Sequence, residues 1–296
     1  MVKSRIFDNS RLLTAHPGIP HYRDEIVCFA SRYEDRSYPA DECYFNRELY
    51  LILIQEGRSE IRLNGTPLTL TANTLLLHGP HYLTDHLYSS PDIHFMTLAI
   101  GESLRTDNAY LAQTTTLLLE LMQHNGQFTI PLTAPESHTL LQELTALTAL
   151  LGTDHRFLRQ RIQTACLALF LDIADMLSHK HIITRRPTRR EHLLAEFHTL
   201  ATQHFREQHF IHFYADRLAI SEQYLSRIVR RGTGKSVGQI LNDLLTMEAS
   251  TLLDTTKESI GEIALRLGFS DTPGFCKFFR RQTGLTPLGF RKRAHL

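Results

Sequence analysis

Between about residues 22 and 100, the chain alternates short apolar runs with turn residues. The runs rich in strand-forming side chains are Leu49–Ile54, Ser59–Leu63, Leu68–Leu70, Thr74–His78 and His94–Ile100. Asn64–Gly65, between two of these runs, is a strong signal for a two-residue β-hairpin. Several short strands at this spacing predict a small β-barrel or sandwich. Residues 1–22, which include Pro17, Gly18 and Pro20, indicate an irregular arm.

After Gly101 the apolar residues recur three and four positions apart, which predicts helices around 108–125, 136–151 and 155–179. In the third segment they form one stripe, with Asp154 as the expected N-cap: Leu158, Ile162, Cys166, Leu169, Ile173 and Met176. Such a stripe packs on its own domain or pairs with the same helix of a second chain. The sequence leaves both options open. In the second case the dimerisation residues are Leu158, Ile162, Leu169 and Ile173.

A polar, basic stretch from His179 to Arg190, interrupted by Pro187, separates these segments from a wholly helical pattern. The fold class expected is therefore α+β with two domains. Residues 1–184 would form the first domain, with a barrel over about 22–100 and helices over about 103–180. Residues 185–192 would be a linker, and residues 193–296 an all-α domain.

The helical third contains an internal repeat. Arg227, Arg230, Arg231, Thr233 and Gly234 recur 50 positions later as Lys277, Arg280, Arg281, Thr283 and Gly284. Upstream, Ala215-x-x-Leu-Ala-Ile-Ser221 matches Ala264-x-x-Leu-Gly-Phe-Ser270 at an offset of 49. Two related units therefore stand in sequence.

Each unit has the layout of a helix-turn-helix. In the first unit, helices of about 213–219 and 222–231 flank a turn that Ser221 would cap. In the second, Ile260–Leu267 and Thr272–Gln282 flank a tight turn at Gly268, and Ser270 or Asp271 is the cap. Ile220 and Phe269 are expected to fill the space between the paired helices.

Composition and charge narrow the function. Apolar residues make up 42% of the chain and charged residues 21%, as in a folded globular protein. Residues 1–184 carry a net charge of −6 and residues 185–296 a net charge of +7, so the repeat lies in a basic segment. An α-helix fits the major groove of DNA, and basic residues at its far end neutralise phosphates. A duplicated helix-turn-helix with matching arginine pairs therefore predicts DNA binding.

Residues from about 190 to 296 resemble the DNA-binding domain of the AraC/XylS family of bacterial transcription regulators. The matching motifs are Leu218-x-Ile-Ser-x-x-Tyr-Leu-Ser-Arg227, Leu252-Leu253, Ser259-Ile-x-x-Ile-Ala264, Leu267-Gly-Phe-Ser-Asp271, Phe275-x-Lys-x-Phe279 and Thr286-Pro-x-x-Phe-Arg291. The resemblance implies two helix-turn-helix units joined by a long helix, here about Val237–Thr255, with recognition helices in successive major-groove segments.

Carried over to this sequence, the resemblance places the base-facing residues of the first unit at Gln223, Ser226 and Arg227. Those of the second unit are Pro273, Gly274 and Lys277. The phosphate contacts are expected at Arg230, Arg231, Arg280 and Arg281. Because Pro273 and Gly274 offer a base little to hydrogen-bond, we expect the first unit to read sequence and the second to position the protein. The family often has Arg where this chain has Thr246, so one backbone contact is expected to be missing.

The strand pattern of residues 22–100 resembles, more weakly, the cupin-like barrel that precedes this domain in the family. There it often senses a small molecule, and the helices after it dimerise. His78, His81, His86 and His94 raise the alternative of a metal-dependent cupin enzyme. However, the barrel has no His-x-His motif followed by Glu, so turn and surface histidines are favoured, with no metal. Its aromatic residues are expected mainly in the core: Phe29, Tyr44, Phe45, Tyr50, Tyr82, Tyr88 and Phe95.

These patterns predict a bacterial, cytoplasmic transcription regulator that binds double-stranded DNA, forms a homodimer and responds to a small effector. RNA polymerase is a further expected partner. No signal peptide, membrane span, catalytic residue or cofactor is expected, and the effector-binding residues stay unassigned. The four separated cysteines, Cys28, Cys43, Cys166 and Cys276, indicate buried reduced thiols. The runner-up is a regulator without a small ligand, which predicts no well-formed cavity in the barrel.

Overall fold

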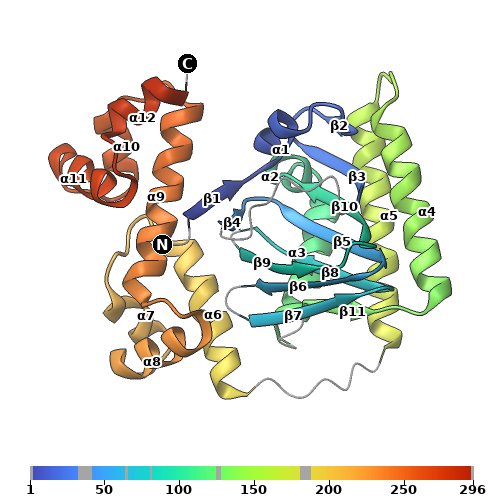
Figure 1. The fold of residues 1–296 in the computed structure, drawn as a ribbon, viewed down its shortest axis with the longest axis horizontal. Helices are drawn as coiled ribbons and strands as arrows, with labels where there is room; N and C mark the ends of the chain where they lie inside the picture. Colours follow the sequence, from blue (N-terminus) through green and yellow to red (C-terminus); the bar gives the residue numbers. More distant parts are fainter. Residues whose placement is uncertain are drawn as a thin grey trace. The chain divides into compact units, whose positions relative to one another are not determined.

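The computed structural model describes residues 3–32, 42–63, 66–80, 82–124, 128–180 and 188–294. The chain folds into two compact units, Met1–Pro187 and Thr188–Leu296. The first unit contains two β-sheets and a layer of helices, and the described part of the second is helical (Figure 1). This confirms the α+β two-domain fold class.

The strands of the first unit form two facing sheets. One has the order β1-β4-β9-β6-β7 and the other β11-β8-β5-β10-β3-β2. Their bounds are β1 Lys3–Phe7, β2 His21–Tyr22, β3 Ile26–Arg32, β4 Glu42–Asn46, β5 Leu49–Glu56, β6 Arg58–Leu63, β7 Thr66–Thr71, β8 Thr74–His78, β9 Leu83–Ser89, β10 His94–Ile100 and β11 Thr129–Pro131. Strands β6 and β7 pair antiparallel up to Leu63 and Thr66, and Asn64 and Gly65, where the hairpin turn is predicted, lie outside the described residues.

The six-stranded sheet is apolar on both faces. Along β5, Leu49, Leu51 and Leu53 belong to the main hydrophobic cluster of the unit. The alternate positions, Tyr50, Ile52 and Ile54, line a cavity between the two sheets. Because side chains on a strand alternate between faces, this one strand supports the core and the cavity at once.

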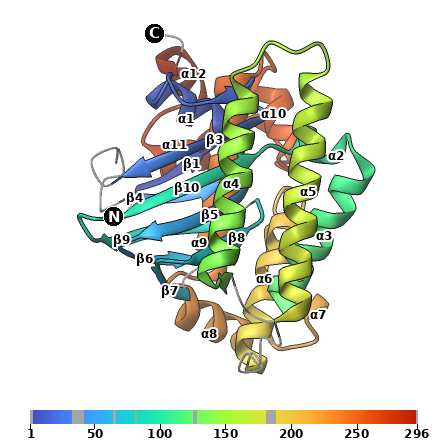
Figure 2. The ribbon, with the colours of Figure 1, turned by 90° about the vertical axis from the view of Figure 1, so that its right-hand side faces the viewer.

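Four helices follow the strands: α2 Glu102–Thr106, α3 Ala109–His124, α4 Ala134–Leu151 and α5 Leu158–His179. Figure 2 shows α4 and α5 lying across the six-stranded sheet, and α4 contacts β3, β5 and β10. Helix α5 packs against α3 and α4. These helices thus cover the leucine face of the sheet and leave the other face to the cavity.

The apolar stripe of α5 serves its own domain. Ile162, Cys166, Leu169 and Ile173 are buried in the same cluster as the leucines of β5, and Leu158 and Met176 pack against that cluster half-buried. The assignment of Ile162, Leu169 and Ile173 to dimerisation is therefore wrong, because one protomer already covers them, whereas the half-buried Leu158 is not tested by this packing. A dimer has to use another surface.

Helix α5 also differs from prediction at its start. It begins at Leu158 after Phe157 rather than after Asp154, because the Phe157 amide donates to His155 Nδ1 at 3.0 Å and holds this segment in a turn. Among the described helices, α5 alone is long and apolar enough to match a membrane span by length and composition. Its buried stripe faces the other helices of the unit, and a core helix of this kind has the length and apolar composition of a membrane span.

The first 22 residues are more ordered than predicted. Strand β1 pairs in parallel with β4, and helix α1 (Asn9–Ala15) begins at Asp8, whose carboxylate accepts a hydrogen bond from the Arg11 amide at 2.9 Å. Leu12 of α1 is buried and lines the cavity between the sheets. The predicted irregular arm is therefore wrong for these residues.

The second unit consists of α6 Arg189–His204, α7 Ile211–Arg217, α8 Glu222–Thr233, α9 Val237–Thr255, α10 Ile260–Arg266, α11 Thr272–Thr283 and α12 Pro287–Ala294. The His192 amide donates to the Thr188 carbonyl at 3.0 Å, so residues 189–192 form the first turn of α6. The sequence placed those residues in the linker, of which residues 185–187 lie outside the described residues. Helix α9 matches the predicted connecting helix, and α8, α10, α11 and α12 contact it.

Candidate DNA interface and ligand cavity

The two helix-turn-helix units have matching turns. Ser221 accepts a hydrogen bond from the Tyr224 amide at 3.2 Å and caps α8. Asp271 accepts one from the Gly274 amide at 2.6 Å and caps α11. Just before the caps, Ala219 and Gly268 have left-handed backbones, with φ of 51° and 73°. The tight turns predicted at these positions are therefore present in both units.

The second helices also end alike. Gly234 and Gly284 take the left-handed conformation, and their amides donate to the carbonyls of Arg230 and Arg280. The hydroxyls of Thr233 and Thr283 each donate a hydrogen bond to the helix carbonyl four residues earlier. Each also accepts a hydrogen bond from the backbone amide two residues later. The Thr-Gly pair is thus a C-terminal stop signal used twice, as glycine C-caps commonly are.

Each second helix buries one face and exposes the other. Leu225, Ile228 and Val229 of α8 are buried, as are Phe275, Phe278 and Phe279 of α11. Phe269 fills the second turn as predicted, with its ring 5.3 Å from that of Phe275. The residues predicted to meet DNA all lie on exposed positions: Gln223, Ser226, Arg227, Arg230 and Arg231 on α8, and Pro273, Gly274, Lys277, Arg280 and Arg281 on α11.

Three arginines converge beside α8. Arg190 of α6 joins Arg227 and Arg231 of α8 around a hollow of about 160 Å³ that Tyr224 and Ile228 also line. The Arg227 guanidinium lies over the Tyr224 ring, 5.1 Å from its centroid. Among the described residues none of the three arginines has a carboxylate partner, whereas Arg206 pairs with Glu248 and Arg266 with Glu258. Unpaired like charges this close repel one another and favour an anion between them. Sequence reasoning missed Arg190, which it had placed in the linker.

Thr246, where the family often has Arg, is half-buried in α9. Its hydroxyl donates to the Asn242 carbonyl at 2.7 Å, within its own helix.

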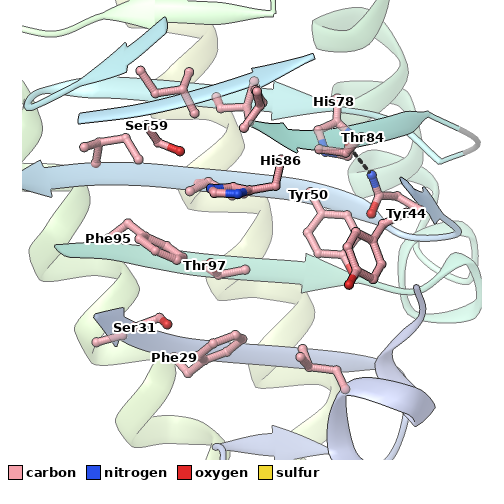
Figure 3. Close-up of a pocket in the computed structure, with 18 of the residues that line it drawn as sticks. Phe29, Ser31, Tyr44, Tyr50, Ser59, His78, Thr84, His86, Phe95 and Thr97 are labelled. Atoms are coloured by element: carbon pink, nitrogen blue, oxygen red, sulfur yellow. Dashed lines mark hydrogen bonds between the residues drawn. The ribbon is translucent and has the colours of Figure 1, made fainter. Parts of the chain in front are cut away.

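The first unit holds a second candidate site, a cavity of about 310 Å³ between the sheets. Seven strands line it with residues two positions apart, as the pleat of a strand requires: Phe29 and Ser31, Tyr44 and Asn46, Tyr50, Ile52 and Ile54, Ser59 and Ile61, Leu76 and His78, Thr84 and His86, and Phe95 and Thr97. Figure 3 shows Tyr44, Tyr50, His78 and Thr84 at one end of the view and Phe29 and Phe95 towards the other. Cavities of this size accept small organic molecules.

Hydrogen bonds fix much of the polar wall. Asn46 Nδ2 donates to Thr84 Oγ1 at 2.7 Å (Figure 3). Ser59 donates to the Tyr88 carbonyl and Ser89 donates to Ser59, so Ser89 has to accept from His86 Nε2 at 2.9 Å. The His78 ring stacks on Tyr50 at 5.4 Å. Burial lowers the pKa of His78 to about 4, so its imidazole is neutral near pH 7.

The cavity corrects two expectations. His78 and His86 line it, so turn and surface positions are wrong for these two histidines. His94 begins β10, and His81 lies outside the described residues. No three His, Cys, Asp or Glu side chains of the described chain come together to hold a metal. Of the aromatic residues expected in the core, Tyr50 belongs to a buried cluster, and Phe29, Tyr82 and Phe95 pack against buried clusters. Phe29, Tyr44, Tyr50 and Phe95 also line the cavity. Tyr88 is exposed instead, and the Phe45 side chain is outside the described set. The sequence signal for this cavity was the pair of polar residues two positions apart in Thr84-x-His86, which share one face of a strand.

Comparisons with known proteins agree with the helix-turn-helix arrangement of the second unit. A family model described as a helix-turn-helix domain matches residues 214–293. The HTH-type transcriptional activator RhaS of Shigella dysenteriae serotype 1 (strain Sd197) is 24% identical over 265 residues, covering 82% of this chain and 84% of the relative. RhaS of Escherichia coli (strain K12 / DH10B) matches over the same shares at the same identity.

Two solved structures are also similar. The DNA-binding domain of AdpA, a global transcriptional factor in complex with a target DNA, is 32% identical over 33% of this chain and 89% of that chain, with a TM-score of 0.32. Wild-type ToxT from Vibrio cholerae strain SCE256, with an unsaturated fatty acid bound, is 13% identical over 92% of this chain and 96% of that chain, with a TM-score of 0.42.

The paired helix-turn-helix units and the regulators that match them define a DNA-binding transcription regulator. These similarities support an AraC/XylS-family regulator with a C-terminal helix-turn-helix domain.

Proposed function

We propose that the regulator binds its operator through the exposed faces of α8 and α11, with α8 reading the bases. The observation that carries this proposal is the duplicated basic face on two helices that end in the same Thr-Gly C-cap. Arg227 and Gln223 suit bidentate bonding to guanine and adenine, whereas Pro273 and Gly274 leave α11 with Lys277 alone. Arg230, Arg231, Arg280 and Arg281 then contact phosphates, together with Arg190.

DNA binding by single variants tests this division of labour. Duplex from the upstream region of the protein's own gene is compared with random duplex at two salt concentrations. We expect Arg227→Ala to cost about 1–3 kcal/mol of discrimination between the two DNAs. Lys277→Ala should weaken both complexes more evenly. A greater loss of discrimination in Lys277→Ala than in Arg227→Ala would show that the second unit reads the sequence.

The cavity in the first unit supports control by a small-molecule effector. It lies between the two sheets, and polar and aliphatic residues contribute to its lining in equal number, together with four phenylalanine and tyrosine residues. A regulator without a ligand predicts no such cavity. The effector would shift DNA binding only by as much as its affinity differs between the two states of the protein.

We further propose a homodimer as the functional form and RNA polymerase as a partner. The curated relatives are named transcriptional activators, which favours contact with the polymerase. The dimer surface is inferred from the outer faces of α3 and α5, where large apolar side chains are exposed: Tyr110, Leu117, Leu121 and Leu171.

A further inference from the structure

The basic side chains in the described lining of the cavity between the sheets are those of His16, His78 and His86, and this lining contains no Asp, Glu, Lys or Arg. The strands themselves bear such residues, but the pleat turns them outward: along β6, Ser59 and Ile61 face the cavity, whereas Arg58 and Glu60 pair with each other on the outer face. An ion entering this cavity would lose its hydration without meeting a carboxylate, ammonium or guanidinium group in the described lining.

The histidine at one end of the cavity presents a hydrogen-bond acceptor. His78 Nδ1 lies 3.0 Å from the Gly79 carbonyl oxygen. Because a carbonyl only accepts, Nδ1 carries the proton, and in the neutral ring Nε2 has a lone pair. No described group is hydrogen-bonded to Nε2, so it is available to a ligand that donates.

Four of the other polar side chains in the wall are held by hydrogen bonds within the protein. Asn46 donates to Thr84, and His86, Ser89 and Ser59 form a chain that ends on the Tyr88 carbonyl. A ligand with many hydroxyls would have to break these bonds. The remaining lining is aliphatic and aromatic, including Phe29, Ile52 and Phe95, and suits an apolar body.

We infer that the cavity binds an uncharged, mainly apolar molecule that donates a hydrogen bond, from a hydroxyl or N–H group, to His78 Nε2. An apolar cavity of about 150 Å³ holds benzene, so this one has room for about twelve non-hydrogen atoms. This inference rests on the proposed effector control and names the chemical class of the effector.

Four probes that share a phenyl-ethane-type body test the class by calorimetry on the full chain: 2-phenylethanol, its methyl ether, phenylacetate and 2-phenylethylammonium. We expect 2-phenylethanol to bind with a Kd of about 1 mM or tighter. The ether, which cannot donate, should bind about 2- to 12-fold more weakly. Both ions should bind at least about tenfold more weakly than the alcohol. An ion that binds as tightly as the alcohol, or no binding by any probe, would overturn the inference.

His78→Phe tests the acceptor, because it keeps an aromatic ring beside Tyr50 and removes Nε2. The alcohol and the ether should then bind equally. His94→Phe is the matched control, because His94 is not among the cavity residues, and it should keep the preference for the alcohol. An unchanged preference in His78→Phe contradicts the assignment. If that variant does not fold, the relative affinities of the four probes for the wild-type protein still test the inference.

Operator binding in the presence of the probes separates this inference from the proposed control. An alcohol that occupies the cavity without changing DNA affinity supports the chemical class and counts against effector control. An ion that changes DNA affinity and loses that effect in Ser31→Phe supports control and overturns the class. Ser31 suits this test because it lines the cavity on the same face of β3 as Phe29, so a larger side chain there occupies the cavity itself.

Discussion

Ala219 occupies a backbone conformation that usually belongs to glycine. Its φ is 51°, and the equivalent residue of the second helix-turn-helix, Gly268, has φ 73°. A left-handed backbone costs a residue with a Cβ about 1–2 kcal/mol. The two helix-turn-helix units therefore have the same left-handed turn at different residues. Only Ala219 has a Cβ, so only the first unit carries the backbone strain.

Ala219→Gly should raise the free energy of unfolding by about 0.5–1 kcal/mol, because relief of strain exceeds the added entropy of the unfolded chain. Gly268→Ala should lower it by more than about 2 kcal/mol, because the new Cβ would lie 2.2 Å from the Arg206 carbonyl oxygen. Urea denaturation of the full chain measures both. Gly238→Ala is the control, since its Cβ meets nothing within 4 Å. A destabilised Ala219→Gly would refute the strain argument.

Residues that carry a local backbone signal were predictable, and residues that act across the fold were not. Ser221, Gly234 and Gly284 cap helices by hydrogen bonds to residues a few positions away. Their residue types therefore predict their roles from the local sequence. The site of His78 depends on Tyr50, from another strand, and on the facing sheet. Nothing in the neighbouring sequence states that this imidazole is buried.

At the level of elements, helix α6 packs against α8, and its first turn lies beside the basic face of α8. Arg190 lies in that turn and meets Arg227 and Arg231 of α8. If the three guanidiniums hold a DNA phosphate, Arg190 contributes affinity without reading sequence.

Arg190→Ala should therefore weaken binding to operator and random duplex alike and reduce the slope of log K against log salt by about 1. Filter binding or fluorescence anisotropy over a salt series gives the slope. Arg217→Ala removes the same charge from the same unit at a side chain that lies over the Phe213 ring. An equal fall in slope for this control would mean that net charge, not a phosphate contact, accounts for the effect.

Elements fixed by neighbouring residues were also the ones predicted well. The β6–β7 strand pair and α9 match their expected positions. Strand β1 was missed because its partner, β4, lies some forty residues further along the chain. Helix α1 is short, and its burial of Leu12 depends on the barrel beneath it. The start of α5 was misplaced because the His155 ring, not Asp154, holds the preceding turn.

For the whole molecule, the family motifs defined the second unit, whereas the cavity of the first emerged only from the packing of two sheets. The α5 stripe shows why oligomeric state is hard to read from periodicity. One apolar stripe serves equally well for a core or for a partner, and here α3 and α4 cover it. One surface available to a partner is the other side of this helical layer.

Four large apolar side chains lie exposed on that side: Tyr110 at 72%, Leu117 at 52% and Leu121 at 42% on α3, and Leu171 at 51% on α5. The α3 residues recur at helical spacing, and α3 contacts α5, so the two helices can present one apolar face. Single exposed apolar residues are ordinary, but an aligned set indicates an interface.

The double variant Leu117→Lys/Leu121→Lys should convert a dimer to a monomer, because it would bury four ammonium groups in the interface of the pair. Sedimentation velocity at micromolar protein measures the change, and binding to a two-site operator should weaken with it. Leu265→Lys is the control, since Leu265 is 78% exposed on α10 in the other unit and should leave the dimer intact. A wild-type protein that sediments only as a monomer, or a double variant that remains dimeric, would exclude this face as the dimer interface.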